Sequence, residues 1–89
     1  MKVTIDISGI RNKRELHRLF KLHLDLPSYY GGNLDALYDC LTERPGETEI
    51  TFVNACDAQE GMASYIRSLR KLTEDVADKK KSFVPVWKD

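Results

Sequence analysis

The sequence is organised around residues 29–42, which read Tyr29-Tyr30-Gly31-Gly32-Asn33-Leu34-Asp35-Ala36-Leu37-Tyr38-Asp39-Cys40-Leu41-Thr42. An aromatic pair and a glycine pair lead into a segment whose apolar residues recur at positions i, i+3, i+4 and i+7. This spacing is typical of a helix that packs one side on a core, and Asn33 is a residue type that caps a helix N-terminus. The stretch therefore predicts a loop followed by a short helix over about residues 33–43.

The opposite side of this predicted helix is acidic. Asp35 and Asp39 are four residues apart, so the two like charges repel each other at a cost of about 0.2–0.5 kcal/mol. No Lys or Arg occurs between Leu22 and Glu43 to relieve this repulsion. Exposed carboxylates usually serve only solubility, and a solvated acidic face is the simpler interpretation. The aromatic and glycine residues next to the pair favour a binding surface instead.

A surface that binds another protein explains most of these residues. Tyr29 and Tyr30 are of the type that anchors interfaces, and we expect Tyr30 to be the more buried of the two. Carboxylates accept paired hydrogen bonds from arginine, and an acidic field speeds the encounter with a basic partner. Paired carboxylates can also bind Mg²⁺ or act as acid and base. A small metal-dependent carboxylate enzyme, with Glu43 as an additional ligand, is therefore the alternative from another class.

Length and composition indicate one ordinary globular domain over residues 1–89. The chain is 42% hydrophobic and 31% charged, which is typical of soluble proteins. It has no apolar run long enough to cross a membrane and no signal peptide, so we expect a cytoplasmic location without membrane contact. Cys40 and Cys56 form neither a disulfide framework nor a zinc pattern, and both are expected to be buried or half-buried free thiols.

The net charge of zero conceals an uneven distribution. Residues 1–21 carry six bases and two acids, and residues 67–89 carry seven bases and four acids. The central block, residues 22–66, carries eight acids and one base. Such a field attracts basic partners and repels nucleic acid, so direct binding of RNA or DNA is not expected.

Outside the central stretch, the periodicity predicts an α/β order of elements. The expected elements are a strand at 3–8, a helix at 13–25, the helix at 33–43, a strand at 48–54, a helix at 58–78 and a strand at 82–87. Asn12 with Glu15, and Asp57 with Glu60, have the spacing of capping boxes for the first and last helices. Right-handed crossovers then give a three-stranded parallel sheet of order 1-2-3 packed with helices. Pro85 places the third strand at an edge.

Motifs for catalysis are not found in the sequence. It contains no Gly-rich phosphate loop, no nucleophile elbow and no zinc-protease motif. His17 and His23 are six residues apart on different faces of the first helix, so they cannot share a metal. We expect His17 to be exposed, His23 to lie at the boundary of the core, and neither to be functional. No catalytic residue, cofactor or metal is predicted.

Residues 26–42 resemble the signature of the barstar family, whose members inhibit barnase-type ribonucleases. The shared pattern reads Leu26-Pro27-x-Tyr29-Tyr30-Gly31-x-Asn33-Leu34-Asp35-Ala36-Leu37-x-Asp39-Cys40-Leu41-Thr42, without a gap. The chain length and the order of elements also fit the family. The resemblance implies a barstar-like fold and a function as an inhibitor of a basic, extracellular-type ribonuclease.

The resemblance also implies a site. In the family, the helix and its preceding loop plug the active site of the ribonuclease, and the carboxylate that matches Asp39 takes the place of an RNA phosphate. The implied partner-binding residues are Tyr29, Tyr30, Gly31, Asn33, Asp35, Tyr38, Asp39, Thr42 and Glu43. The family presents a further acid from its last helix, for which Glu74, Asp75 and Asp78 are the candidates.

This chain departs from the family pattern at several positions. Tyr38 replaces a frequent tryptophan, Gly32 replaces an acid, and Glu43 and Arg44 replace small and aromatic residues. Arg44 would face a cationic active site unfavourably. The partner therefore need not be barnase itself, and an immunity protein against a different basic toxin is the alternative within the same class. In either case we expect a free monomer that protects a cell from its own or a neighbour's toxin.

Overall fold

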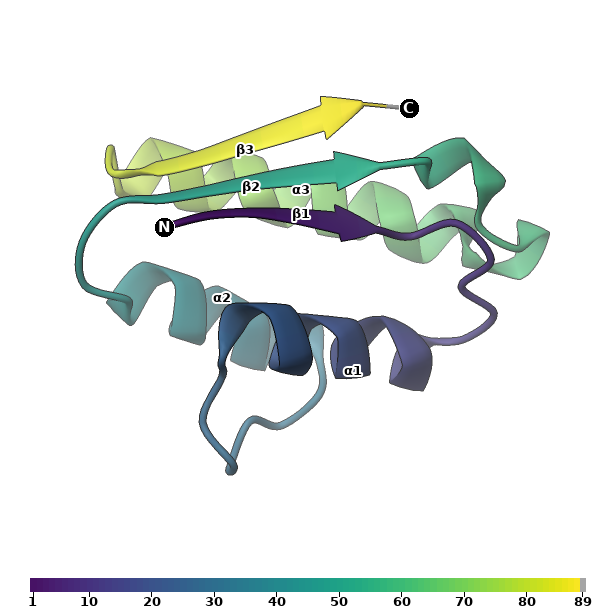
Figure 1. Cartoon of the computed structure of the whole chain (residues 1–89), viewed down its shortest axis with the longest axis horizontal. Coiled ribbons are helices and arrows are strands. Elements are labelled where there is room, and N and C mark those ends of the chain that lie inside the picture. The colour runs from purple at the N-terminus through teal and green to yellow at the C-terminus, as the bar shows by residue number, and fades with distance from the viewer. Residues whose placement is uncertain (89) are drawn as a thin grey trace.

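Three parallel strands and three α-helices form two layers in the computed structural model, which describes residues 1–88 (Figure 1). The elements are β1 (Lys2–Asp6), α1 (Lys13–Leu24), α2 (Leu34–Glu43), β2 (Thr48–Val53), two 3₁₀ turns η1 (Ala55–Asp57) and η2 (Glu60–Met62), α3 (Ala63–Lys79) and β3 (Phe83–Lys88). The strand order β1-β2-β3, all parallel, confirms the predicted topology. Among residues 1–88, no helix combines the length and the apolar character needed to span a membrane.

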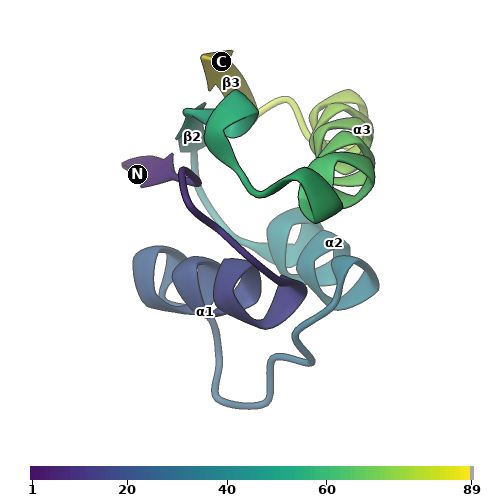
Figure 2. The same ribbon diagram turned by 90° about the vertical axis from the view of Figure 1, so that its right-hand side faces the viewer.

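The three helices all lie on one face of the sheet, and the other face is left uncovered (Figure 2). The alternation along β2 follows from this arrangement, since Ile50 and Phe52 are buried whereas Thr51 and Val53 are partly exposed. The third strand lies at an edge, as Pro85 predicts. A two-layer fold of this kind places every helix on the same side of the molecule, where α1 and α2 can contribute to one surface.

Aromatic contacts join the helices to the sheet in the core. Phe20 of α1 meets Phe52 of β2 edge to face with 6.3 Å between ring centroids. Phe52 stacks on Trp87 of β3 at 4.1 Å. Burial of a large apolar side chain stabilises a fold by about 1.5–3 kcal/mol, so this row fixes α1 against the strands. The full core cluster contains Ile5, Ile7, Ile10, Leu16, Phe20, Leu24, Leu26, Leu37, Leu41, Ile50, Phe52, Met62, Ile66, Leu69, Leu72, Val76 and Phe83.

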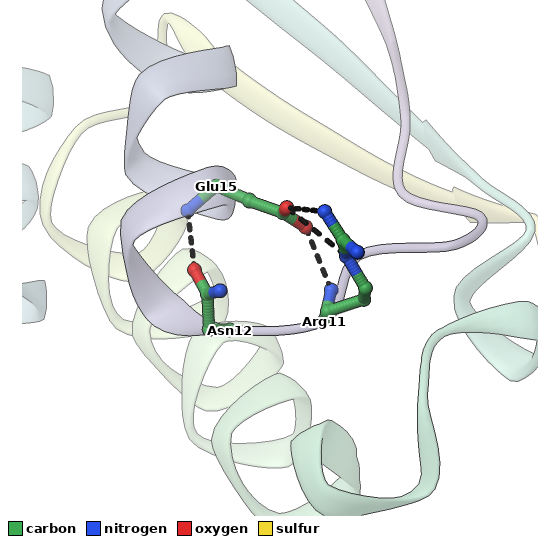
Figure 3. A network of polar contacts seen from close by, with 3 residues as sticks. All are labelled: Arg11, Asn12 and Glu15. Atoms are coloured by element: carbon green, nitrogen blue, oxygen red, sulfur yellow. Dashed lines mark hydrogen bonds and ion pairs between the residues drawn. The ribbon is translucent and has the colours of Figure 1, made fainter.

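The start of α1 is fixed by a network of three residues (Figure 3). Asn12 Oδ1 accepts a hydrogen bond from the Glu15 backbone N–H at 2.9 Å, which confirms the predicted N-cap. The Glu15 carboxylate accepts from the Arg11 backbone N–H and forms an ion pair with its guanidinium at 2.8 Å. These hydrogen bonds and the positive charge of Arg11 lower the pKa of Glu15. The helix ends before Asp25, whose φ of 52° is left-handed.

The predicted start of the last helix was wrong. The helix begins at Ala63 rather than at residue 58, and no side-chain hydrogen bond of Asp57 caps it. Asn54 has a left-handed φ of 62°, which turns the chain at the end of β2. The Gln59 N–H then donates to the Ile10 carbonyl at 3.0 Å. This contact with the β1–α1 connection holds the segment in 3₁₀ turns before α3 can start.

The two cysteines differ in burial. Cys40 is half-buried, as predicted, whereas Cys56 is exposed, so the prediction for Cys56 was wrong. Its position in the 3₁₀ turn η1, outside a packed helix face, explains the exposure. Both thiols are free.

Candidate functional site

Helix α2 presents its acids to solvent because its apolar side packs on the core. Leu37 and Leu41 are buried, whereas Asp35 and Asp39 are exposed. Asn33 Oδ1 accepts a hydrogen bond from the Ala36 N–H at 2.8 Å, which confirms the predicted N-cap. Within residues 1–88, neither aspartate side chain has an ion pair or a hydrogen bond. Two carboxylates are therefore displayed on a rigid element without an internal partner.

The acidic field of α2 also acts on the thiol beside it. Burial raises the pKa of Cys40, and the negative charges of Glu43 and Asp39 raise it further. Glu43 is exposed at the C-terminal end of the helix. The outer side of α2 is thus acidic along its whole length.

In the loop 25–33 before α2, one tyrosine is exposed and the next is half-buried, as predicted. Tyr29 is 84% exposed, whereas Tyr30 is half-buried and packs against the core. Gly32 has a left-handed φ of +70°, a conformation that favours glycine. A Cβ at Gly31 would lie 3.4 Å from the Ala36 Cβ, so Gly31 sits directly against the first turn of α2. Tyr29 lines one surface hollow with Cys40 and Glu43 of α2, so the loop places this tyrosine beside the C-terminal part of the helix.

Tyr30 is hydrogen-bonded to His17, a buried histidine that was predicted to be exposed. His17 is only 4% exposed, whereas His23 is exposed, so both expectations were wrong. His17 Nδ1 lies 2.5 Å from Tyr30 Oη, and its Nε2 lies 2.6 Å from Tyr65 Oη. A neutral imidazole has one N–H donor and one acceptor, so it can satisfy both hydroxyls. These two partners explain how a polar ring is tolerated inside the core.

Burial sets the charge state of this cluster. It lowers the pKa of His17 and raises the pKa of both Tyr30 and Tyr65, so all three groups favour their neutral forms. The cluster joins α1, the loop 25–33 and α3 at one point. His17 thus acts as a positioning residue for the loop. The sequence carried no local sign of this role, since Tyr65 is 48 positions from His17.

The C-terminal part of α2 is bound to its own chain. Tyr38 is half-buried against the core. The Thr42 hydroxyl donates to the Tyr38 carbonyl at 2.9 Å, so its proton is used within the helix. The Arg44 guanidinium donates to the Leu24 carbonyl at 2.7 Å and contacts the Met1 sulfur. Arg44 therefore reaches the end of α1, but it also lines the hollow that contains Tyr29 and Glu43.

The candidate acids of the last helix differ in position. Asp75 and Asp35 line the same surface hollow of about 470 Å³, whereas neither Glu74 nor Asp78 lines it. The Asp75 carboxylate forms an ion pair with Lys71 at 3.1 Å. The remaining residues around the hollow are Tyr38, Ser64, Arg67, Ser68, Lys71 and Leu72. The structure thus brings Asp75, alone of the three candidates, into a hollow shared with α2.

A metal site is not assembled around these acids. In the part of the chain that the structure describes, no group of three or more His, Cys, Asp or Glu side chains could hold a metal ion. The hypothesis of a metal-dependent carboxylate enzyme needs such a group. What the described residues do assemble is an exposed tyrosine, two unpaired aspartates and a firmly anchored loop.

Comparison with known proteins places this arrangement in a family. A family model described as "Barstar (barnase inhibitor)" matches residues 1–87. A stretch of 41 residues is 54% identical to the Bacillus subtilis (strain 168) protein named "Putative ribonuclease inhibitor YrdF". That match covers 46% of this chain and 45% of the relative, so it spans just under half of the relative's length. The family model covers the chain almost from end to end, and the chain belongs to the barstar family.

Proposed function

We propose that this protein inhibits a basic ribonuclease of the barnase type by covering its active site with the loop 25–33 and α2. The observation that carries the proposal is the exposed pair Asp35 and Asp39, which has no internal partner and lies on the helix that follows the loop with the 84%-exposed Tyr29. The membership of the barstar family and the name of the Bacillus subtilis relative support the same class of function. Inhibition is stoichiometric and reversible, and needs neither cofactor nor turnover.

The two aspartates serve as substitutes for the phosphates of RNA. A ribonuclease active site must hold a polyanion, so it offers cationic groups that accept a carboxylate equally well. An arginine of the enzyme can form two parallel hydrogen bonds to the carboxylate of Asp39. Asp35 adds a second charge contact one helical turn earlier. Their combined field raises the association rate with a basic enzyme.

The residues around the aspartates have supporting roles. Tyr29 is the aromatic anchor that becomes buried in the complex. Gly31 and Asn33 shape the loop, Tyr30 anchors it from inside, and Tyr38 fills the space beneath the contact surface. The remaining contacts come from Thr42 and Glu43 of α2 and from the acids of α3, with Asp75 first because it shares a hollow with Asp35, and with Glu74 and Asp78 as its neighbours on the same helix.

The test is inhibition of a barnase-type ribonuclease on an RNA substrate at low and high salt. We expect one molecule of the wild-type protein to block one enzyme, with weaker inhibition at high salt. Asp39→Ala should raise the inhibition constant by at least about 30-fold, since loss of a central charged contact costs about 2–5 kcal/mol or more. Its melting temperature should stay unchanged because the Asp39 side chain is exposed.

Glu47→Ala is the matched control, because it removes an exposed acid outside α2. Its inhibition constant should equal that of the wild type. If Asp39→Ala unfolded the protein, Asp39 would be a structural carboxylate and the proposed site would be wrong. If the folded wild type inhibited no ribonuclease of this type, the target would be a different basic toxin. Capture of the partner from the source cell, with Asp39→Ala as the negative control, would then identify it.

The proposed setting is the cytoplasm, where such an inhibitor protects a cell that makes the ribonuclease or meets it from a neighbour. The free protein is proposed to be a monomer with no membrane partner.

A further inference from the structure

Helix α1 carries a row of cations next to the proposed inhibitory loop. Arg14, Arg18 and Lys21 lie at positions i, i+4 and i+7, and all three are exposed. They line a surface hollow of about 540 Å³ together with His17 and with Tyr30 and Gly32 of the loop. We call Arg14, Arg18 and Lys21 the α1 ridge. The hollow that the ridge lines contains two loop residues, Tyr30 and Gly32, and shares no lining residue with the hollow of Asp35 and Asp75.

The α1 ridge forms no ion pair within the described chain, and the nearby Glu15 carboxylate, whose pKa the charge of Arg18 helps to lower, is already paired with Arg11. None of its three side chains has an ion pair among residues 1–88, although their neighbours Arg11 and Glu15 form one. Arg14 and Arg18 are one turn apart, so they repel each other in the free protein. A partner that supplied carboxylates here would relieve that repulsion.

The ridge is hard to reconcile with a partner that is basic over its whole contact surface. An enzyme seated on Tyr29, Asp35 and Asp39 approaches the loop, and the ridge begins beside that loop (Figure 2). Like charges facing each other across an interface oppose binding, whereas complementary potentials favour it and fix the register. The contact surface of this chain therefore has two signs, with an acidic half on α2 and a basic half on α1.

We propose that the α1 ridge binds carboxylates that border the active site of the target ribonuclease. The target then has a cationic centre for Asp35 and Asp39 and an acidic rim for Arg14, Arg18 and Lys21. This inference rests on the proposed function, since it describes the partner of the same surface. It also accounts for a chain of zero net charge in which the central block, residues 22–66, carries eight acids and one base while the first 21 residues carry six bases and two acids.

The experiment reverses the charge of the ridge. The probe is the ribonuclease that the wild type inhibits in the assay above, and the variant is Arg14→Glu with Arg18→Glu. Both side chains are exposed, so the melting temperature should be kept. We expect the inhibition constant to rise by about 10- to 100-fold, mainly through slower association at low salt. Replacing carboxylates at the enzyme's active-site rim by lysine should restore inhibition by this variant.

The matched control is Lys2→Glu with Lys88→Glu, which changes the net charge by the same amount. Both lysines are exposed and lie on β1 and β3, away from the loop and helices. The control should inhibit like the wild type, which separates a local contact from a general charge effect. If the ridge variant inhibited as well as the wild type, or better, the inference would be overturned. Loss of inhibition in Asp39→Ala alone would leave the proposed function standing.

A single-stranded RNA oligonucleotide tests the other ligand that a row of cations could hold. We expect the free wild-type protein not to bind this probe at physiological salt, because the acidic half of the surface lies beside the ridge. If the protein bound RNA, and the ridge variant lost RNA binding but kept full inhibition, the ridge would be a nucleic-acid site. That result would contradict an acidic rim on the enzyme.

Discussion

The imidazole of His17 is the residue on which the geometry of the loop depends most. Its two nitrogens reach the hydroxyls of Tyr30 and Tyr65, which belong to the loop and to α3. If the imidazole were removed, two buried hydroxyls would lose their partner, and each unsatisfied group costs about 1–3 kcal/mol. The function of Tyr29 and Asp35 therefore depends on a side chain that never touches the ribonuclease in the proposed complex.

His17 should also make stability depend on pH in a defined window. Burial lowers its pKa in the folded protein, so below the unfolded value of about 6.5 the unfolded state binds more protons. The free energy of unfolding should therefore fall as the pH is lowered from about 6.5 toward 5, above the range in which carboxylates titrate. We expect His17→Ala to lose about 2–4 kcal/mol of stability at neutral pH and to lose this pH dependence.

Denaturant unfolding of the wild type and of His17→Ala between pH 5 and pH 8 would measure both effects. His23→Ala is the control, because His23 lies on the same helix and is exposed. It should unfold like the wild type within about 0.5 kcal/mol. A pH profile that is the same for His17→Ala and the wild type would show that another group titrates.

At the scale of elements, the first turn of α2, which carries Asp35, is fixed by two contacts with the preceding loop. Asn33 caps the helix, and Gly31 lies against Ala36. Asn33→Ala should remove the capping hydrogen bond and destabilise the protein by about 1 kcal/mol. Asp35 would fray with this turn, so inhibition should weaken as well. Thermal unfolding checks the first effect, and Asn33→Asp should restore stability because aspartate caps equally well. Equal stability of all three proteins would contradict a role for the cap.

The elements that the sequence predicts correctly are those whose signals are local. The two faces of α2, its N-cap and the N-cap of α1 can be read from residues within one or two turns. The exposure of Tyr29 over Tyr30 was also predicted correctly. What could not be predicted depends on distant partners. The late start of α3 follows from a contact between Gln59 and Ile10, and the burial of His17 requires Tyr65.

The residues of the candidate site also divide into those with a local sequence signal and those whose position depends on tertiary packing. The pattern over residues 26–42 gives the acids and the loop from the sequence alone. Among the three candidate acids of the last helix, only Asp75 shares a hollow with Asp35, and this position depends on how α3 packs against α2. The α1 ridge could not be predicted as a binding surface either. Rows of exposed cations are common on helices, and only the structure shows that this row lies beside Tyr30 and Gly32 of the loop.

At the scale of the whole molecule, residues 1–88 leave one sheet face without a helix and have two edge strands, β1 and β3 (Figure 2). An edge strand has unpaired backbone groups that can hydrogen-bond to a strand of another chain. A proline in an edge strand disfavours such pairing because it has no N–H to donate. Pro85 lies within the edge strand β3. We therefore expect Pro85 to protect the β3 edge and to help keep the free protein monomeric in the proposed function.

Replacement of Pro85 tests whether this proline prevents self-association through the β3 edge. We expect the wild-type protein to sediment as a monomer of 10.2 kDa. Pro85→Val keeps an apolar side chain of good strand propensity and restores a backbone donor to β3. It should raise the dimer fraction at high protein concentration in sedimentation velocity runs. Inhibition should be unchanged, because β3 lies on the layer away from the loop (Figure 1).

Val84→Thr, at an exposed position of the same strand, is the control and should stay monomeric. A monomeric Pro85→Val protein would mean that other features protect the edge.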